Sequence, residues 1–187
     1  MKALIISGSL AIPSHTYSLL KETEKYLKEK GCSVVFYDLK TNKLPECDPK
    51  YHHNPKANPD EKVVEFIKLA EEADFIIWGT PNYHNSYSGV LKSALDHLNF
   101  DQLSNKPIGL MCNSGGIRNV QPLDHLRIVA RGFLGIAIPI QVATRNADYQ
   151  LINDEYHLID EGIRQRLEAF VEQLIDFNAM LKLKSLS

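Results

Sequence analysis

Residues 7–16 carry groups suited to binding an anion. They join a short apolar run to a helical pattern, so free N–H groups at the start of that helix would face a ligand. Ser9, Ser14 and Thr16 add hydroxyl donors. The segment contains neither the G-x-G-x-x-G turn of dinucleotide sites nor the G-K-[ST] sequence of triphosphate loops. It therefore suits a terminal phosphomonoester, and the alternative is that Ser14 simply caps the helix.

Residues 80–89 combine aromatic and amide side chains. The segment reads Thr-Pro-Asn-Tyr-His-Asn-Ser-Tyr-Ser-Gly and follows another buried apolar run. A planar heteroaromatic ligand needs flat contacts and polar groups at its edge, and this segment offers both. The alternative is an ordinary loop that enters a helix capped by Ser88.

Residues 113–119 form a third segment of this kind. The adjacent glycines Gly115 and Gly116 would let the backbone approach a ligand closely, although a plain turn between a strand and a helix fits the same residues. Arg118 follows the glycine pair. It could meet a nucleotide phosphate, or it could be a solvated loop arginine.

Alternating strands and helices must position these three segments. Continuous apolar runs predict strands, and 3.6-residue spacing of apolar residues predicts helices. The predicted strands span residues 2–7, 33–38, 74–79, 107–112 and 136–142. The predicted helices span residues 14–30, 60–73, 88–100 and 122–133, and a last helix begins at about residue 160. A loop with four prolines is expected over residues 41–59.

This alternation predicts an α/β fold. Buried strands separated by amphipathic helices indicate a parallel sheet covered on both faces, and right-handed crossovers leave few topologies. We expect one domain over residues 1–187, a flavodoxin-like three-layer sandwich with a five-stranded parallel sheet of order 2-1-3-4-5. The three segments then meet at the carboxyl edge of the sheet. A phosphate loop beside a planar-ring site indicates a mononucleotide, and in this fold FMN is the leading candidate.

Composition excludes several other classes of protein. Lys plus Arg is 21 and Asp plus Glu is 23, so the formal charge of −2 offers no field for nucleic acid. The uncharged stretch 132–144 is too short to span a bilayer. Three widely spaced cysteines, with no C-x-x-C, indicate neither disulfides nor zinc and favour a cytoplasmic location. The adjacent His52 and His53 lack the spacing of metal ligands, so no metal is expected.

Residues 81–96 read P-N-Y-H-N-S-Y-S-G-V-L-K-S-A-L-D. They match the pattern P-x-Y-x-x-S-x-x-G-x-L-K-x-A-x-D of the NAD(P)H-dependent FMN reductase family at every fixed position, and the chain resembles that family over nearly its whole length. The resemblance implies three groups of FMN-binding residues. These are Ser9, Ser14, His15 and Thr16 at the phosphate; Pro81, Asn82, Tyr83, His84 and Ser86 along the isoalloxazine and ribityl chain; and Ser114, Gly115 and Gly116 at the pyrimidine side. From their residue types and positions, Tyr83 and Arg118 are the candidates for contact with the substrate.

The resemblance also implies a function. NADH or NADPH would reduce the flavin, which would then reduce a quinone, azo compound, free flavin, metal oxyanion or dioxygen in a ping-pong cycle, with no catalytic side chain required. Members are commonly dimers or tetramers. One departure is Ala11, where many members carry arginine, so residues 7–16 contain no Lys or Arg. The alternatives are a flavodoxin-type electron carrier, which would be strongly acidic, and a flavin-free binding module.

Overall fold

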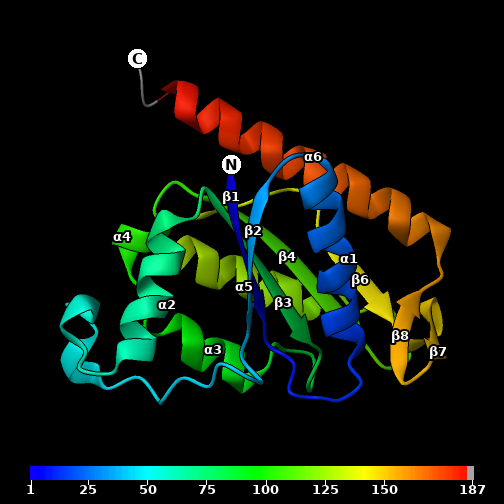
Figure 1. Cartoon of the computed structure of the whole chain (residues 1–187), viewed down its shortest axis with the longest axis horizontal. Helices are drawn as coiled ribbons and strands as arrows, with labels where there is room; N and C mark the ends of the chain where they lie inside the picture. The colour runs from blue at the N-terminus through cyan, green and yellow to red at the C-terminus, as the bar shows by residue number, and fades with distance from the viewer. Residues whose placement is uncertain (185–187) are drawn as a thin grey trace.

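A twisted parallel sheet forms the centre of the computed structural model, which describes residues 1–184 (Figure 1). Its strand order is β2-β1-β3-β4-β5, and β6 also pairs with β4. The strands are β1 (Lys2–Ser7), β2 (Ser33–Asp38), β3 (Phe75–Pro81), β4 (Pro107–Ser114), β5 (Ile136–Ala137) and β6 (Val142–Arg145). The predicted order is confirmed.

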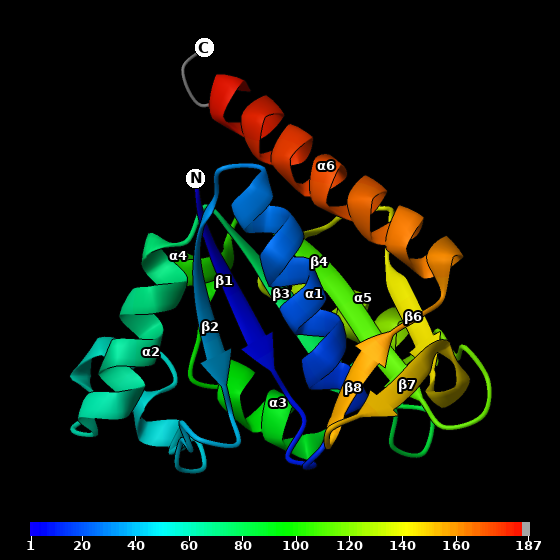
Figure 2. The same cartoon turned by 45° about the vertical axis from the view of Figure 1, so that its right-hand side comes forward.

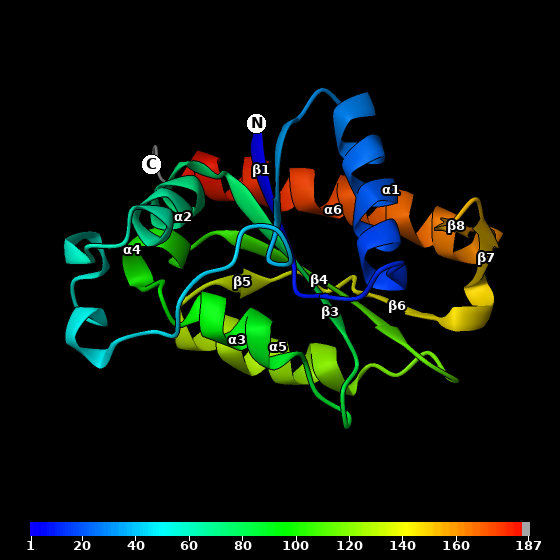
Figure 3. The same cartoon turned by 60° about the horizontal axis from the view of Figure 1, so that its bottom comes forward.

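Helices cover both faces of this sheet. They are α1 (His15–Glu29), α2 (Glu61–Glu72), α3 (Gly89–Leu95), α4 (Phe100–Leu103), α5 (Gln121–Gly132) and α6 (Glu161–Lys184). Figure 3 shows α1 and α6 above the sheet and α3 and α5 below it. Each face has its own apolar core, with Leu20 and Phe170 in one and Phe66 and Leu91 in the other. The structure is therefore the three-layer sandwich that the alternating pattern predicts.

The fifth strand differs from the prediction of one strand over residues 136–142. It is divided into β5 and β6, with Pro139 between them. Proline has no N–H to donate to a ladder, so the pairing is interrupted there. Both pieces pair with β4, β5 at its first two residues and β6 at Met111–Ser114.

Two other boundaries also differ. The helix predicted over residues 88–100 ends at Leu95, and α4 begins separately after Asn99, whose side chain forms a capping box with Gln102. The third and fourth strands each run two residues further than predicted, to Pro81 and Ser114. In the proline-rich loop, the 3₁₀ turns Pro49–Tyr51 and Pro55–Ala57 are the regular elements.

A β-hairpin that the sequence analysis missed lies between β6 and α6. A 3₁₀ turn (Asn146–Asp148) leads into β7 (Tyr149–Ile152), which pairs antiparallel with β8 (Glu155–Leu158). Its turn residues Asn153 and Asp154 have φ of 49° and 62°, a left-handed pair typical of a two-residue hairpin turn. The predicted strict alternation is therefore wrong here. Figure 2 shows the hairpin beside α1 and β6.

Among residues 1–184, no helix is long and apolar enough to cross a membrane. The same residues contain no group of three His, Cys, Asp or Glu side chains placed to hold a metal ion.

Candidate functional site

The loops after β1, β3 and β4 meet at the carboxyl edge of the sheet. Ser7 pairs with Gly79 in register, and Gly79 pairs with Met111. Just beyond, the Gly8 N–H donates to the Gly79 carbonyl at 2.8 Å. A Cβ on Gly8 would lie 2.8 Å from the Leu91 Cβ, so only glycine allows this approach of β1 to α3. The sheet thus brings the three predicted segments together.

The first loop is organised by two serines. The Ser14 hydroxyl caps α1 by accepting from the Tyr17 N–H at 3.1 Å, as the capping interpretation predicts. The same hydroxyl donates to Ser9 Oγ at 2.8 Å. Ser9 and Thr16 are both buried. The Ser9 and Ser14 hydroxyls therefore lie together at the start of α1, whose first N–H groups favour an anion.

The His15 ring points to the hairpin. It stacks on Tyr156, with ring centroids 3.6 Å apart, and meets the edge of Tyr149 at 5.1 Å. Burial lowers the pKa of His15 below its usual 6.5, so the ring is neutral at pH 7. It therefore adds no cation to a loop that already lacks Lys and Arg. The backbone N–H of His15, in the first turn of α1, remains suited to an anion.

Ser88 connects the second loop to the first. Its hydroxyl caps α3 by accepting from the Leu91 N–H at 3.3 Å, as predicted, and donates to the Gly8 carbonyl at 2.7 Å. Its N–H donates to Thr80 Oγ1 at 2.9 Å. Because Ser88 and Thr80 are buried, these bonds hold the two loops at a fixed spacing.

The tip of the second loop is a tight turn. Tyr83 and Ser86 exchange backbone hydrogen bonds of 2.9 and 3.0 Å, and His84 and Asn85 between them have φ of 51° and 64°. This turn leaves the Tyr83 side chain about half exposed. Ser86 Oγ lies 3.0 Å from Nδ1 of His125 on α5, a contact that sequence reasoning did not anticipate.

The third loop is held by an arginine at its base. Arg118 donates from Nε and Nη2 to Asp148 at 2.9 and 2.8 Å, and Nη2 also contacts Asp160. Burial opposes ionisation of Asp148, but bonds from Arg118 and Arg145 outweigh it and lower its pKa. Arg118 is thus an ion-paired residue rather than a solvated loop arginine. Gly115 and Gly116 are exposed, and a Cβ on either would meet no atom within 4 Å.

Unpaired polar atoms gather at this edge. Within residues 1–184, five buried side-chain polar atoms have no hydrogen-bond partner. Three of them, Ser7 Oγ, Asn82 Oδ1 and Ser114 Oγ, lie at the ends of β1, β3 and β4. Each such atom costs about 1–3 kcal/mol unless a ligand satisfies it. Hydroxyl and amide groups suit the N–H and C=O edge of a flavin, so these residues fit FMN.

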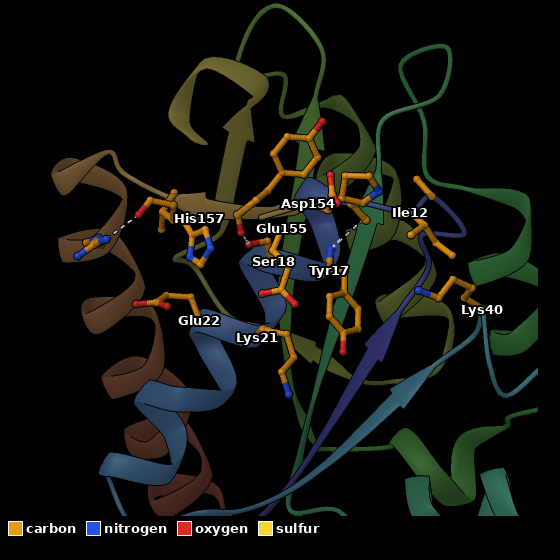
Figure 4. Close-up of a pocket in the computed structure, with 15 residues that line it drawn as sticks. Ile12, Tyr17, Ser18, Lys21, Glu22, Lys40, Asp154, Glu155 and His157 are labelled. Atoms are coloured by element: carbon orange, nitrogen blue, oxygen red, sulfur yellow. Dashed lines mark hydrogen bonds between the residues drawn. The ribbon is translucent and has the colours of Figure 1, made fainter. Parts of the chain in front are cut away.

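A cavity of about 500 Å³ lies between the first loop, α1 and the hairpin. Its walls are residues 11–14, the outer face of α1 and residues 154–158 of the hairpin. Figure 4 shows Tyr17, Ser18 and Lys21 of α1 and Lys40 around it, with Asp154 and Glu155 facing them. Residues of the second and third loops do not line it, so the cavity adjoins the three-loop site only through the first loop.

This sheet order, with an anion-binding loop after β1 and polar loops after β3 and β4, defines a flavodoxin-like nucleotide-binding protein. A family model described as NADPH-dependent FMN reductase matches residues 1–148, and the chain belongs to that family. It is 41% identical over 178 residues to the FMN-dependent NADPH-azoreductase of Staphylococcus saprophyticus, with 95% of each chain covered. A Staphylococcus aureus protein of the same name is also 41% identical, again with 95% coverage of both.

Solved structures show the same fold at low identity. FerB, a flavoenzyme NAD(P)H:(acceptor) oxidoreductase from Paracoccus denitrificans, has a TM-score of 0.75 at 22% identity, covering 96% of this chain and 97% of that one. A flavodoxin from Streptococcus pneumonia has a TM-score of 0.63 at 16% identity, covering 94% and 99%. The predictions of a flavodoxin-like fold, FMN as cofactor and an NAD(P)H-dependent oxidoreductase are confirmed.

Sequence reasoning missed the residues outside the three loops that contact the first and third of them. Asp148, Tyr149 and Tyr156 belong to the hairpin region and contact the first and third loops. A signal was present in the sequence: Asn153-Asp154 is a turn dipeptide flanked by Leu-Ile and Glu-Tyr.

Proposed function

We propose that this protein oxidises NADPH and reduces an aromatic acceptor, an azo compound or a quinone, in a ping-pong cycle. When bound, FMN supplies the redox chemistry between the two substrates. The observation that carries the proposal is the set of unpaired polar atoms at the ends of β1, β3 and β4, in a chain of the FMN reductase family. The azoreductase names of relatives at 41% identity support the choice of acceptor.

The chain's own residues divide the binding work among three loops. The first loop holds the phosphate with the hydroxyls of Ser9, Ser14 and Thr16 and with N–H groups of the first turn of α1, including that of His15. The other two loops line the ring and ribityl chain, and their residues are Pro81, Asn82, Tyr83, His84 and Ser86 in the second and Ser114, Gly115 and Gly116 in the third. Because each glycine faces open space, the backbone of the third loop is free to approach a planar ring.

Tyr83 is placed to serve the substrates. Its half-exposed ring stands at the tip of the second loop, where it is accessible for stacking on a nicotinamide or an aromatic acceptor. In our proposal both substrates use this one face in turn. Arg118 is engaged with Asp148 and Asp160, so its contribution to nucleotide binding is through the shape of the third loop.

Anaerobic absorption spectroscopy separates this function from that of an electron carrier, which would share the fold and FMN. The protein loaded with FMN is yellow, and we expect NADPH to bleach it within seconds and an azo dye to restore the colour. A yellow protein inert to both NADPH and NADH identifies the carrier. A colourless protein that cannot be loaded with FMN excludes both functions.

We further infer that the protein is a homodimer or homotetramer of the cytoplasm, acting on small molecules. Large apolar side chains remain exposed near the site and on α5, including Ile12 (80%), Ile117 (71%) and Ile128 (61%). Exposed apolar side chains of this size often contribute to subunit interfaces, and we infer that these do. Light scattering at several concentrations tests the assembly, and a monomer throughout would contradict it.

A further inference from the structure

The hairpin β7–β8 contacts the first turn of α1. Tyr156 stacks on His15 at 3.6 Å between ring centroids, and Tyr149 meets the same ring edge-on at 5.1 Å. One turn later, the Ser18 hydroxyl donates to the Tyr156 carbonyl (Figure 4). The helix end whose N–H groups face the proposed phosphate site is therefore packed directly against the hairpin.

The residues at the base of the hairpin contact the third loop. Asp148 is almost fully buried and accepts two hydrogen bonds from Arg118 and one, at 2.9 Å, from the Arg145 N–H. The Asp148 carbonyl accepts from the Ile159 N–H at 2.9 Å, which closes the base of the hairpin. The bidentate pair fixes the orientation of the Arg118 guanidinium and so ties the third loop to the base of the hairpin.

A buried chain of hydrogen bonds joins the hairpin to the end of β4. The Tyr149 hydroxyl contacts Thr144 Oγ1 at 3.0 Å, and Thr144 Oγ1 contacts Asn113 Oδ1 at 3.0 Å. The Asn113 carbonyl then accepts from the Asn82 N–H at 2.8 Å. Through these bonds the hairpin also reaches the start of the second loop.

We propose that the hairpin is the element that positions the FMN site, with Tyr156 setting the first turn of α1 and Asp148 setting the third loop through Arg118. This inference rests on the proposed assignment of the loops to FMN. Residues 7–16 contain no Lys or Arg, so a phosphate there depends on how accurately N–H and hydroxyl groups are aimed. The hairpin begins at Tyr149, just after the part of the chain that the family model matches.

Flavin binding tests the role of Tyr156. The full chain is freed of flavin, and dissociation constants for FMN and riboflavin are measured by quenching of flavin fluorescence. Tyr156→Ala removes the stack, and we expect FMN to bind about tenfold more weakly while riboflavin, which has no phosphate, changes less than twofold. Tyr156→Phe keeps the stack and should restore FMN binding. Tyr51→Ala, in the remote 3₁₀ turn, is the matched control and should change neither constant.

The same measurement tests the clamp on the third loop. Arg118→Lys keeps the charge but loses the bidentate geometry, and we expect it to weaken FMN and riboflavin by the same factor, about fivefold. Asp148→Asn should repeat this pattern. Thermal unfolding of each flavin-free variant is recorded in parallel, so that a variant with lost structure is recognised. If Tyr156→Ala does not fold, Tyr156→Leu, which removes the stacked ring but keeps an apolar side chain, is measured in its place.

Distinct results overturn the inference and the function. If wild type binds FMN more tightly than riboflavin and Tyr156→Ala weakens both flavins equally, or neither, the hairpin does not position the phosphate loop. If Arg118→Lys leaves both constants unchanged, the clamp has no positioning role. If wild type itself binds no FMN, the proposed function fails before the hairpin is tested.

Discussion

The two edges of the central sheet differ in whether their buried polar groups have hydrogen-bond partners. At the amino edge, Asp74 accepts from the Lys2 N–H at 2.7 Å and from Lys182 Nζ at 2.6 Å. Lys106 donates to the Ala70 and Glu71 carbonyls at the end of α2, at 2.8 and 2.7 Å. At the carboxyl edge, Ser7, Asn82 and Ser114 each keep a buried polar atom without a partner.

We interpret this difference as the place where the fold gives up stability for the proposed flavin binding. The same strands run from one edge of the sheet to the other. At the amino edge, Lys106 shows that a side chain is able to satisfy carbonyls that a helix end leaves free. Leaving three polar atoms unpaired at one edge is therefore a property of that edge and not of parallel sheets in general. Strained or unsatisfied groups are expected to collect at functional sites.

The largest effect should come from removing two hydroxyls of the first loop, where we propose that the FMN phosphate binds. Ser9→Ala combined with Thr16→Ala removes two hydroxyls that would make charge-assisted bonds, and we expect at least about 2 kcal/mol of FMN affinity, roughly 30-fold, to be lost. Fluorescence titration of the flavin-free protein measures it. The control is Thr41→Ala combined with Ser104→Ala, outside the three loops. Unchanged FMN affinity in the Ser9→Ala and Thr16→Ala double variant would refute the assignment of the first loop to the phosphate.

Substituting one glycine at each edge of the sheet allows the two edges to be compared directly. A Cβ at Gly8 would clash with Leu91 and Ser88, and one at Gly135 would clash with the end of Ile108. We expect Gly8→Ala to lower both the free energy of unfolding, by about 1.5 kcal/mol, and FMN affinity, since it separates the first two loops. Gly135→Ala should lower only stability. Denaturant unfolding measures the free energy of unfolding, and flavin titration measures FMN affinity. If Gly8→Ala and Gly135→Ala lose the same FMN affinity, the two edges do not differ in their role in binding.

A smaller effect should appear with opposite signs in stability and binding. Ser114→Ala removes a buried hydroxyl that has no partner, so the flavin-free protein should gain about 1 kcal/mol in free energy of unfolding. The same variant should bind FMN and riboflavin more weakly. Lys106→Met is the counterpart at the amino edge and should lose stability with no change in flavin binding. A loss of stability in Ser114→Ala would mean that its hydroxyl already has a role without flavin.

The smallest effect is a pH dependence at His15. Because burial lowers its pKa below 6.5, the unfolded chain binds more protons than the folded chain just below that pH. The free energy of unfolding of the flavin-free protein should therefore decrease as the pH falls through 6.5. His15→Phe keeps a ring against Tyr156 and should reduce this decrease, whereas His52→Phe should not. An identical pH profile for His15→Phe would show that His15 is not desolvated by the hairpin.

Local pattern predicted most of the sheet, and its failures have identifiable physical causes. β1 and β2 have the predicted bounds because unbroken apolar or β-branched runs end at polar residues. The fifth strand was predicted too long because an apolar run alone does not reveal that Pro139 lacks the N–H needed for a ladder hydrogen bond. The hairpin was missed because its strands are four residues each, and Leu151 and Ile152 stay exposed rather than marking a buried face.

Taken by itself, the sequence determined the sheet order, the three loops and the FMN reductase resemblance, because periodicity, right-handed crossovers and a contiguous motif are local or nearly local properties. The tertiary structure decided which side the His15 ring faces, that Arg118 is paired with a carboxylate 30 residues away, and which hydroxyls stay unpaired. Each of these depends on contacts between segments distant in the chain. Whether a serine is a cap, a ligand or an unsatisfied donor is set by its neighbours in space, and those neighbours are set by packing.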